Sequence, residues 1–268
     1  MLQAYGYINE EERATLDQRQ DLEGDAAYDI GLANLMVRDA LDKNPDALIT
    51  ITTPVSQLAV NATLEMDDPP IIVFNVVPNP YVAGIADAPC IKPAHVSASQ
   101  FLAPYDRIVP LMLLQNPDMQ VANEHRLPVM YTAGNAVYRG ATIGAGVYSY
   151  FKEGVIAARM LLAHWEGAMD IAAAGINLQN DMSVGVNLDV AADQGLEISP
   201  EVLAAADFVV EDGQSSEGVT PGLPEVNPYL DDMTVDQRRA VDLAFLETLR
   251  CTDEMIAEQQ AQLDADSE

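Results

Sequence analysis

The segment 27–77 alternates between the hydrophobic periodicities of helix and strand, and this alternation limits the folds open to the chain. Apolar residues at helical spacing run through 27–43 and stop at Asn44-Pro45, which predicts a helix. The apolar run 47–52 that follows predicts a short buried strand. The apolar positions expected on the helix are Ile30, Leu32, Ala33, Leu35, Met36, Val37 and Leu41.

A second helix and a second strand come directly after. Thr53 suits a helix cap and Pro54 suits a first helical turn, so a helix is expected to continue from Val55 to Thr63. The apolar run 71–77 is flanked by turn residues and predicts a central strand. Helix, strand, helix and strand in this order predict an α/β fold, with a parallel sheet covered by helices on both faces.

The same alternation returns in the second half of the chain. A helix is expected over 150–165, two short helices are expected through Val210, and strands are expected over 127–132, 140–147 and 182–188. The apolar face of the 150–165 helix comprises Phe151, Val155, Ala158, Met160, Leu161, Leu162 and Trp165. Because 268 residues exceed the usual size of a single domain, one large domain or two lobes are expected.

The composition changes at Gly213. Residues 213–228 are rich in glycine, proline and serine, which is typical of a linker. Thr234 and Gln237 then have the spacing of a capping box, and a terminal helix is expected over 234–263. We expect this helix to dock through an apolar stripe of Val241, Phe245, Leu249 and Ile256, with Arg238, Arg239, Asp242 and Glu247 on the soluble face.

Charge excludes several classes of partner. The chain has 42 acidic and 13 basic side chains and a formal net charge of -29, so nucleic acid and anionic membrane surfaces would repel it. Only three of the basic residues are lysines, Lys43, Lys92 and Lys152. Acid-rich, lysine-poor surfaces suit a saline or extracytoplasmic setting, although a GC-rich genome would produce the same bias.

Three further absences exclude classes of protein. Cys90 and Cys251 are too few for a disulfide scaffold or a four-thiolate zinc site. The sequence offers no run of about 20 apolar residues that would predict a membrane span. The first ten residues lack the basic region, apolar core and cleavage site of a signal peptide. Either the protein stays where it is made, or the chain begins after processing.

Catalytic and metal-binding motifs have little support. His95, His125 and His164 are far apart and have no ligand-spaced cysteine or carboxylate beside them, which favours structural roles. The glycine-rich stretch 140–146 has neither dinucleotide nor P-loop spacing, and it is better explained as a closely packed strand. We therefore expect a protein that is not an enzyme and that carries no cofactor or metal.

Three loops remain as candidates for a binding site. Each follows a predicted strand, at the edge of an α/β sheet where helix N-termini offer free backbone N–H groups to ligands. Ordinary turns also contain such residues, so a purely structural role stays open. The loops are Thr52-Thr53-Pro54 with Gln57, Val77-Pro78-Asn79-Pro80-Tyr81, and Thr132-Ala133-Gly134-Asn135.

Several segments resemble one known family. The resemblance lies in NPDALITITTPVSQ at 44–57, VPNPYVAG at 77–84, VANEHRLPVM at 121–130, GATIGAGVYSY at 140–150 and GLEISPEVLAAAD at 195–207. Their order and spacing are similar to those of ABC-transporter substrate-binding proteins of the tryptophan/tyrosine type. The resemblance covers about residues 5–210. It implies a two-lobed, type I periplasmic-binding-protein-like α/β fold with parallel sheets flanked by helices.

The resemblance also implies a domain organisation. Lobe 1 would comprise residues 1–103, with about 147–168 returning to it, and lobe 2 would comprise the rest of 104–212. Residues 213–268 would form the linker and a C-terminal amphipathic helix. No counterpart of the family's first strand precedes Met1, and two βα units of the family are absent near residue 120. Acidic positions near the family's ligand correspond here to Asn79, Ala133 and Gly134.

The function implied is capture of a small, amino-acid-like solute in an interlobe cleft for an ABC importer. The protein would be extracytoplasmic and would not span a membrane, and its partners would be the solute and an ABC permease or another subunit bound through the C-terminal helix. The alternative is a degenerate binding-protein fold that serves as a structural or interaction subunit. The expected ligand-binding residues are Thr52, Thr53, Gln57, Pro78, Asn79, Tyr81, Gly134, Asn135, Tyr148 and Tyr150.

Overall fold

The computed structural model divides the chain into two compact units. Unit 1 comprises residues 1–101, 152–178 and 227–268, and unit 2 comprises 102–151 and 179–226. The structure describes residues 7–16, 23–27, 29–101, 130–147, 151–179, 183–216 and 233–267. The predicted strand segment 127–129, His125, Tyr148 and Tyr150 therefore lie outside the described residues.

Unit 1 is built on a four-stranded sheet. The strand order is β1-β2-β3-β6, and β1, β2 and β3 run parallel with Ile49 opposite Val73 and Phe74 opposite Ala98. The strands are β1 (Ala47–Ile51), β2 (Ile71–Asn75), β3 (Val96–Phe101) and β6 (Asn177–Gln179). The predictions of a strand at 47 and a central strand at 71 are confirmed. Burial of the first strand was predicted wrongly, because β1 is an edge strand whose Ile49 and Ile51 are 54% and 57% exposed.

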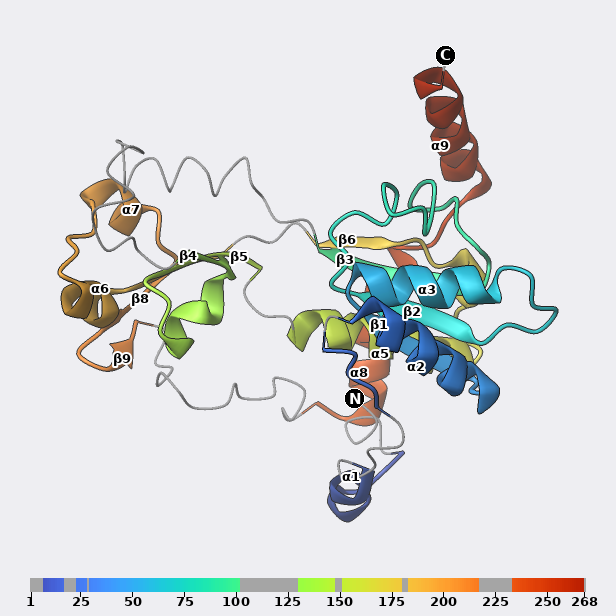
Figure 1. Ribbon diagram of the computed structural model, residues 1–268, viewed down its shortest axis with the longest axis horizontal. Helices are drawn as coiled ribbons and strands as arrows, with labels where there is room; N and C mark the ends of the chain where they lie inside the picture. The colour runs from blue at the N-terminus through green and yellow to red at the C-terminus, as the bar shows by residue number, and fades with distance from the viewer. Residues whose placement is uncertain are drawn as a thin grey trace. The chain divides into compact units, whose positions relative to one another are not determined.

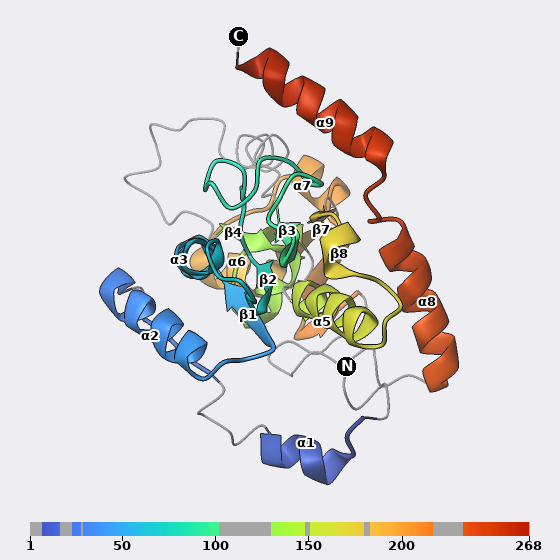
Figure 2. The ribbon, with the colours of Figure 1, turned by 90° about the vertical axis from the view of Figure 1, so that its right-hand side faces the viewer.

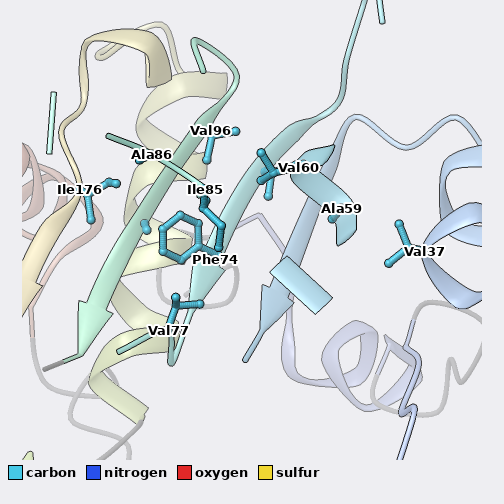
Figure 3. Close-up of a cluster of buried hydrophobic side chains, with 11 residues drawn as sticks. Val37, Ala59, Val60, Phe74, Val77, Ile85, Ala86, Val96 and Ile176 are labelled. Carbon is cyan, nitrogen blue, oxygen red and sulfur yellow. The ribbon is translucent and has the colours of Figure 1, made fainter. Parts of the chain in front are cut away.

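Two helices cover one face of this sheet, α2 (Ile30–Asp42) and α3 (Thr53–Thr63). The core between them and the strands centres on Phe74 and Ile72 of β2 and includes Val37 and Val60 from the helices (Figure 3). Both helices confirm the sequence pattern. The expected apolar face of α2 is only partly correct, since Ala33 and Val37 are buried whereas Ile30, Leu32 and Leu35 are exposed.

The helices α5 (Phe151–Trp165) and α8 (Val235–Glu247) lie on the opposite face of the sheet (Figures 1 and 2). Their core includes Val73 of β2, Met160 of α5 and Leu246 of α8. The predicted helix at 150–165 is confirmed. Trp165 was wrongly placed on its apolar face, because it ends the helix with 54% of its surface exposed.

The predicted single helix at 234–263 is wrong, because the chain forms two helices, α8 and α9 (Asp253–Asp266). Residues 248–252 between them leave the helical conformation and pair with the segment before β6, where Ala174 and Arg250 form an antiparallel bridge. The capping box of Thr234 and Gln237 at the start of α8 is confirmed. Most of α9 extends away from the rest of unit 1 and none of its residues is buried, although Gln259 Oε1 accepts a hydrogen bond from Cys90 N at 2.8 Å (Figures 1 and 2).

The predicted docking stripe on these helices is also partly wrong. Phe245 and Leu249 pack against the core, but Val241 and Ile256 are exposed. The buried residues of α8 are instead Arg238, Asp242 and Leu246, which share one face at i, i+4 and i+8. Asp242 is buried as a charge because Arg159 of α5 lies 2.7 Å away and forms an ion pair with it. Apolar periodicity alone therefore predicted a face of α8 next to the one that is buried.

Cys90 and Cys251 form a disulfide bond that the sequence analysis did not predict. The bond joins residues 161 apart in sequence, one in the loop before β3 and one between α8 and α9. Backbone hydrogen bonds surround it, from Gly175 N to Leu249 O (2.8 Å) and from Cys251 N to Ala173 O (2.9 Å). The C-terminal helices are thus held to unit 1 covalently as well as by packing.

Unit 2 has a five-stranded mixed sheet in the order β4-β5-β7-β8-β9. The β4–β5 and β7–β8 pairs are parallel, whereas β5–β7 and β8–β9 are antiparallel. The expected strands near 143 and 183 are confirmed, but the helices expected through Val210 end earlier and β8 follows. The strands are β4 (Met130–Ala133), β5 (Ile143–Val147), β7 (Ser183–Asn187), β8 (Phe208–Glu211) and β9 (Gln214–Ser215).

Short helices complete this unit, namely η3 (Gly134–Arg139), α6 (Leu188–Gln194) and α7 (Pro200–Ala204). Asn187 and Ser199 cap α6 and α7 by accepting hydrogen bonds from Val190 N (2.9 Å) and Val202 N (3.3 Å). In unit 1, a short helix α1 (Glu10–Leu16) and a turn η4 (Ile171–Ala173) are also present. No helix in the described ranges has both the length and the apolar character to cross a membrane.

Candidate functional site

The N-terminus of α3 follows β1 through a residue with an unusual backbone conformation. Thr52 connects β1 to α3 with φ of 76° and ψ of 154°, a conformation that a β-branched residue rarely adopts. Its N–H still continues the sheet ladder by donating to Asn75 O at 3.1 Å. Its side chain makes no capping hydrogen bond to α3. The first turn of α3 therefore lacks the hydroxyl cap that the sequence led us to expect.

The uncapped turn presents free backbone donors. Ser56 N donates to Thr52 O at 3.1 Å as the first bond of the helix, and Pro54 has no N–H to satisfy. Among the described residues, none accepts a hydrogen bond from the N–H groups of Thr53 or Val55. The first turn contains no acidic residue. Because the positive end of the helix dipole adds to these donors, the turn is suited to a carboxylate or another small anion.

Two buried hydroxyl groups hold this turn in place through hydrogen bonds. Ser56 Oγ donates to Thr52 O at 2.8 Å, and Thr50 Oγ1 donates to Ser56 Oγ at 2.9 Å. Both side chains are buried. The sequence analysis did not select Thr50 or Ser56 as functional, because a hydroxyl inside a predicted strand or helix has no distinctive spacing. Their role is to position the Thr52 carbonyl and hence the donors that follow it.

The loop after β2 lies next to this turn and is held by amide side chains. Asn79 Oδ1 accepts hydrogen bonds from Tyr81 N (3.2 Å) and Val82 N (3.0 Å), and Gln57 Nε2 donates to Ala83 O at 2.6 Å. Gln57 comes from the exposed surface of α3. The structure thus brings the predicted residues Gln57, Asn79 and Tyr81 together, with the amide groups of Gln57 and Asn79 engaged in shaping the loop.

Gln100 supports the same loop from β3 and was missed by the sequence analysis. Its Nε2 donates to the carbonyl oxygen of Pro78 at 3.0 Å, and the side chain is 1% exposed. Its Oε1 is buried and has no hydrogen-bond partner among the described residues. A glutamine followed by phenylalanine gives no motif, so only the pairing of β3 beside β2 reveals that it faces this loop.

Tyr81 lies half-buried over the core of unit 1, where it packs with the cluster that includes Val77. Burial raises the pKa of its hydroxyl to about 12. The phenol therefore stays neutral over the physiological range. It can offer a ring face and a hydrogen-bonding hydroxyl to a ligand, as expected of an aromatic residue in a binding site.

The predicted residues of unit 2 form a separate group. Gly134 begins η3 directly after β4, and it is buried against β7. A Cβ at Gly134 would lie only 2.0 Å from Ser183 Oγ and 3.2 Å from the Ser183 carbonyl oxygen. Close packing therefore accounts for this glycine. Asn135 is the next residue of η3, and the predicted binding roles of Gly134, Asn135, Tyr148 and Tyr150 stay predictions.

Two of the histidines make structural contacts. His95 Nε2 lies 2.9 Å from Thr63 Oγ1, and His164 Nδ1 accepts a hydrogen bond from Ile171 N at 3.2 Å. Burial, and to a lesser extent the charge of Lys92, lowers the pKa of His95. Within the described ranges, no three histidine, cysteine or carboxylate side chains gather as a metal ion would require.

Comparison with known proteins shows similarity at the level of structure. No protein-family model matches the chain, and no curated protein matches it. A conserved domain protein from Vibrio cholerae superposes with a TM-score of 0.53 and 19% identity, covering 68% of this chain and 84% of the other. The ABC domain in complex with L-Trp from Streptococcus pneumoniae superposes with a TM-score of 0.55 and 16% identity, covering 68% and 86%.

These similarities concern the fold. Each match extends over residues of both units, since 68% of this chain exceeds either unit alone. The expected α/β class is confirmed, with β1, β2 and β3 of unit 1 forming a parallel sheet flanked by helices. The sheet of unit 2 is mixed, because β5–β7 and β8–β9 are antiparallel. The chain therefore shares its overall fold with these two solved structures, one of which was determined in complex with L-Trp.

Proposed function

We propose that the protein is an extracytoplasmic solute-binding protein that captures a small, amino-acid-like carboxylate for an ABC importer. The observation that carries this proposal is the uncapped N-terminus of α3, where no described residue accepts a hydrogen bond from the N–H groups of Thr53 and Val55. A carboxylate has two oxygens and can accept both hydrogen bonds. Such charge-assisted bonds are about twice as strong as neutral ones.

The surroundings of this turn agree with such a ligand. Tyr81 supplies a neutral aromatic ring beside the loop that Gln57 and Asn79 hold in place. A protein of the same fold binds L-Trp, which has both a carboxylate and an aromatic side chain. For Gly134, Asn135, Tyr148 and Tyr150 of unit 2, a role in solute binding stays a prediction. The proposed role is capture and release without chemistry.

The disulfide supports the proposed location. Disulfide bonds persist in oxidising compartments and are rare in the cytosol of most organisms. The Cys90–Cys251 bond links the segment between α8 and α9 to the loop before β3, and it forms only where the two thiols can be oxidised. A periplasmic or cell-surface setting would provide such conditions. The acidic, lysine-poor composition is compatible with the same setting.

The test compares ligands with and without a carboxylate. Isothermal titration calorimetry with a panel of L-amino acids and of their carboxamides should give binding for at least one acid and none for its amide. The variant Thr53→Asp places a like charge in the first turn of α3 and should weaken that binding by about tenfold or more, equivalent to 1.4 kcal/mol. Thr53→Asn has nearly the same shape without the charge and should bind within a few-fold of wild type.

The stability of Thr53→Asp shows whether binding is lost through the added charge or through disruption of the fold. An acid in the first turn interacts favourably with the helix dipole. The free energy of unfolding of Thr53→Asp should therefore equal that of the wild type or exceed it by about 0.3–1 kcal/mol in a denaturant titration. Loss of binding with preserved stability supports the carboxylate site. If acids and amides bind alike, or if neither binds in the whole panel, the proposal is wrong.

A second candidate is an interaction subunit of a larger assembly. One observation favours it: α9 is a helix of 14 residues with no buried residue, and a helix of that length is marginal in water on its own. Deleting 252–268 should then abolish an assembly seen by light scattering without changing the affinity for any solute. An unchanged particle mass after this deletion would count against the candidate.

A further inference from the structure

The outer edge of β1 is an open hydrogen-bonding surface. In the β1–β2 ladder, Ile71 N donates to Asp46 O and Thr52 N donates to Asn75 O, each at 3.1 Å. In a parallel ladder the groups directed at one neighbour recur every second residue. The N–H and C=O groups of Ala47, Ile49 and Ile51 consequently point away from β2, and β1 is the last strand in this sheet of the described chain.

The side chains at this edge are apolar as well as uncovered. Ile49 and Ile51 lie on the same face of the sheet as Val73 of β2. Val73 is fully buried and packs in the cluster that includes α5. Ala47 at the start of β1 still packs against the cluster that includes α5, but Ile49 and Ile51 further along the strand are more than half exposed. The neighbouring helix α2 also has exposed apolar residues, since 64% of the surface of both Ile30 and Leu35 is accessible. Figure 3 shows α2 lying beyond the β1 side of the sheet.

This edge lacks the devices that usually prevent strand pairing. Natural edge strands are blunted by lysine, proline, an inward charge or a bulge. The five residues of β1 are Ala-Leu-Ile-Thr-Ile, and their register with β2 has no irregularity. An unprotected apolar edge of this kind matches the docking mode in which an extended segment adds a strand to a sheet.

Charge indicates what kind of segment would bind. Asp39, Asp42 and Asp46 are exposed around the start of β1, and Lys43 is already paired with Asp39 at 2.7 Å. A second copy of the chain would bring the same acids and a net charge of -29 to the interface. We propose that the β1 edge binds an extended, β-branched segment with cationic ends from another protein, which adds as a strand beside Ile49 and Ile51.

The test uses a synthetic probe with the full-length protein. The probe is an eight-residue peptide in which valine and threonine alternate between two terminal lysines, and the control peptide has proline in place of the two central residues. Amide hydrogen exchange by NMR reports on each strand residue. In the free protein the amides of Leu48 and Thr50 should be protected by β2, and those of Ile49 and Ile51 should exchange rapidly. The probe should slow the second pair by about tenfold or more and leave the first pair unchanged.

Variants identify the surface. Ile49→Pro removes an N–H that makes no bond to β2, so the fold should persist while the probe no longer protects Ile51. Ile49→Lys should weaken binding by adding a charge that repels the cationic probe. Ile256→Lys on α9 is the matched control, because it adds the same charge at another exposed isoleucine and should bind the probe like wild type.

Two outcomes would overturn the proposal. The first is an unchanged exchange rate for Ile49 and Ile51 in the wild-type protein at millimolar probe. The second is slow exchange of these amides without any probe in a protein that sediments as a dimer, since a second copy would then occupy the edge. The calorimetric measurements on amino acids do not enter this test, so it can fail while the solute-binding proposal stands.

Discussion

Arg159 Nε on α5 lies 2.7 Å from Asp242 Oδ1 on α8, and the two side chains are 15% and 3% exposed. The guanidinium also lies over the Phe245 ring, 5.3 Å from its centroid. This buried ion pair joins α8 to α5 within unit 1. Removing one partner of such a pair leaves an uncompensated buried charge.

Asp242→Ala should therefore lower the free energy of unfolding by about 3–5 kcal/mol in urea titrations. The double variant Arg159→Met with Asp242→Leu removes both charges and keeps apolar volume, so it should recover most of that loss. Asp236→Ala, at an almost fully exposed acid on the same helix, is the control and should change stability little. A double variant as unstable as the single one would show that packing, not the unpaired charge, causes the loss.

Removing the disulfide should loosen the C-terminal helices. In the chain-entropy model, a closed loop of 161 residues contributes about 5 kcal/mol to stability. Cys90→Ser with Cys251→Ser should thus unfold at lower urea, and limited proteolysis should cut the 248–252 junction faster. Wild-type protein under reducing conditions should match the double variant. Equal cleavage rates for oxidised and variant protein would mean that the bridge and packing contacts hold the helices unaided.

Two glycines should respond in opposite directions to alanine. A Cβ at Gly185 on β7 would lie 2.6 Å from the Phe208 ring and 2.7 Å from the Gly134 carbonyl oxygen, so Gly185→Ala should destabilise unit 2 by about 1–3 kcal/mol. Gly154 in α5 has open space at the same position. Gly154→Ala should stabilise the protein by about 0.5–1 kcal/mol through helix propensity. Thermal unfolding of both variants checks the pair, and a destabilised Gly154→Ala would contradict the contacts described for α5.

Lys92 should give the protein a measurable pH dependence. Burial, opposed by the nearby charge of Asp170, lowers the pKa of Lys92 from 10.5 to about 8. Its Nζ donates to the Ile171 carbonyl oxygen at 3.3 Å. Because the unfolded chain binds the proton more tightly, the contribution of Lys92 is fully present above pH 10.5 and is lost as the pH falls through 8. The full effect is about 3 kcal/mol at most.

Urea titrations between pH 8 and pH 10 test this dependence, below the range where Tyr81 titrates. Stability of the wild-type protein should contain a component that rises with pH, and Lys92→Met should remove it. Lys43→Met, at an exposed lysine on α2, should retain the rise. If both variants follow the wild-type curve, the Lys92 ammonium is better solvated than its position indicates.

The strands and helices of unit 1 were largely predictable because each is specified by local periodicity. Asn44-Pro45 ends α2, Pro54 starts α3, and the run from Ile71 forms the central strand. Burial was less predictable, because it depends on what lies beside an element. Ile49 has the pattern of a core residue, and only the strand order shows that it lies at an edge.

The site was predictable in outline only. The strand ends selected Thr53, Gln57 and Asn79, since parallel strands end at the same edge of a sheet, and their role in binding stays a prediction. The hydroxyl and amide supports, Thr50, Ser56 and Gln100, have no sequence signal and depend on long-range pairing. The Arg159–Asp242 pair was missed for the same reason, because charged residues on α8 were assigned to its soluble face.

The disulfide also sets an order of events during synthesis. Cys90 emerges 161 residues before its partner, so the native bond can form only when nearly the whole chain is available. Within these 268 residues there is no third cysteine, so no other pairing is possible among them. An incorrect bond of Cys90 or Cys251 would then join it to a thiol of another molecule, such as a second unfinished chain. Crowding of unfinished chains, rather than shuffling within one molecule, is therefore the hazard that oxidative folding of this protein must avoid.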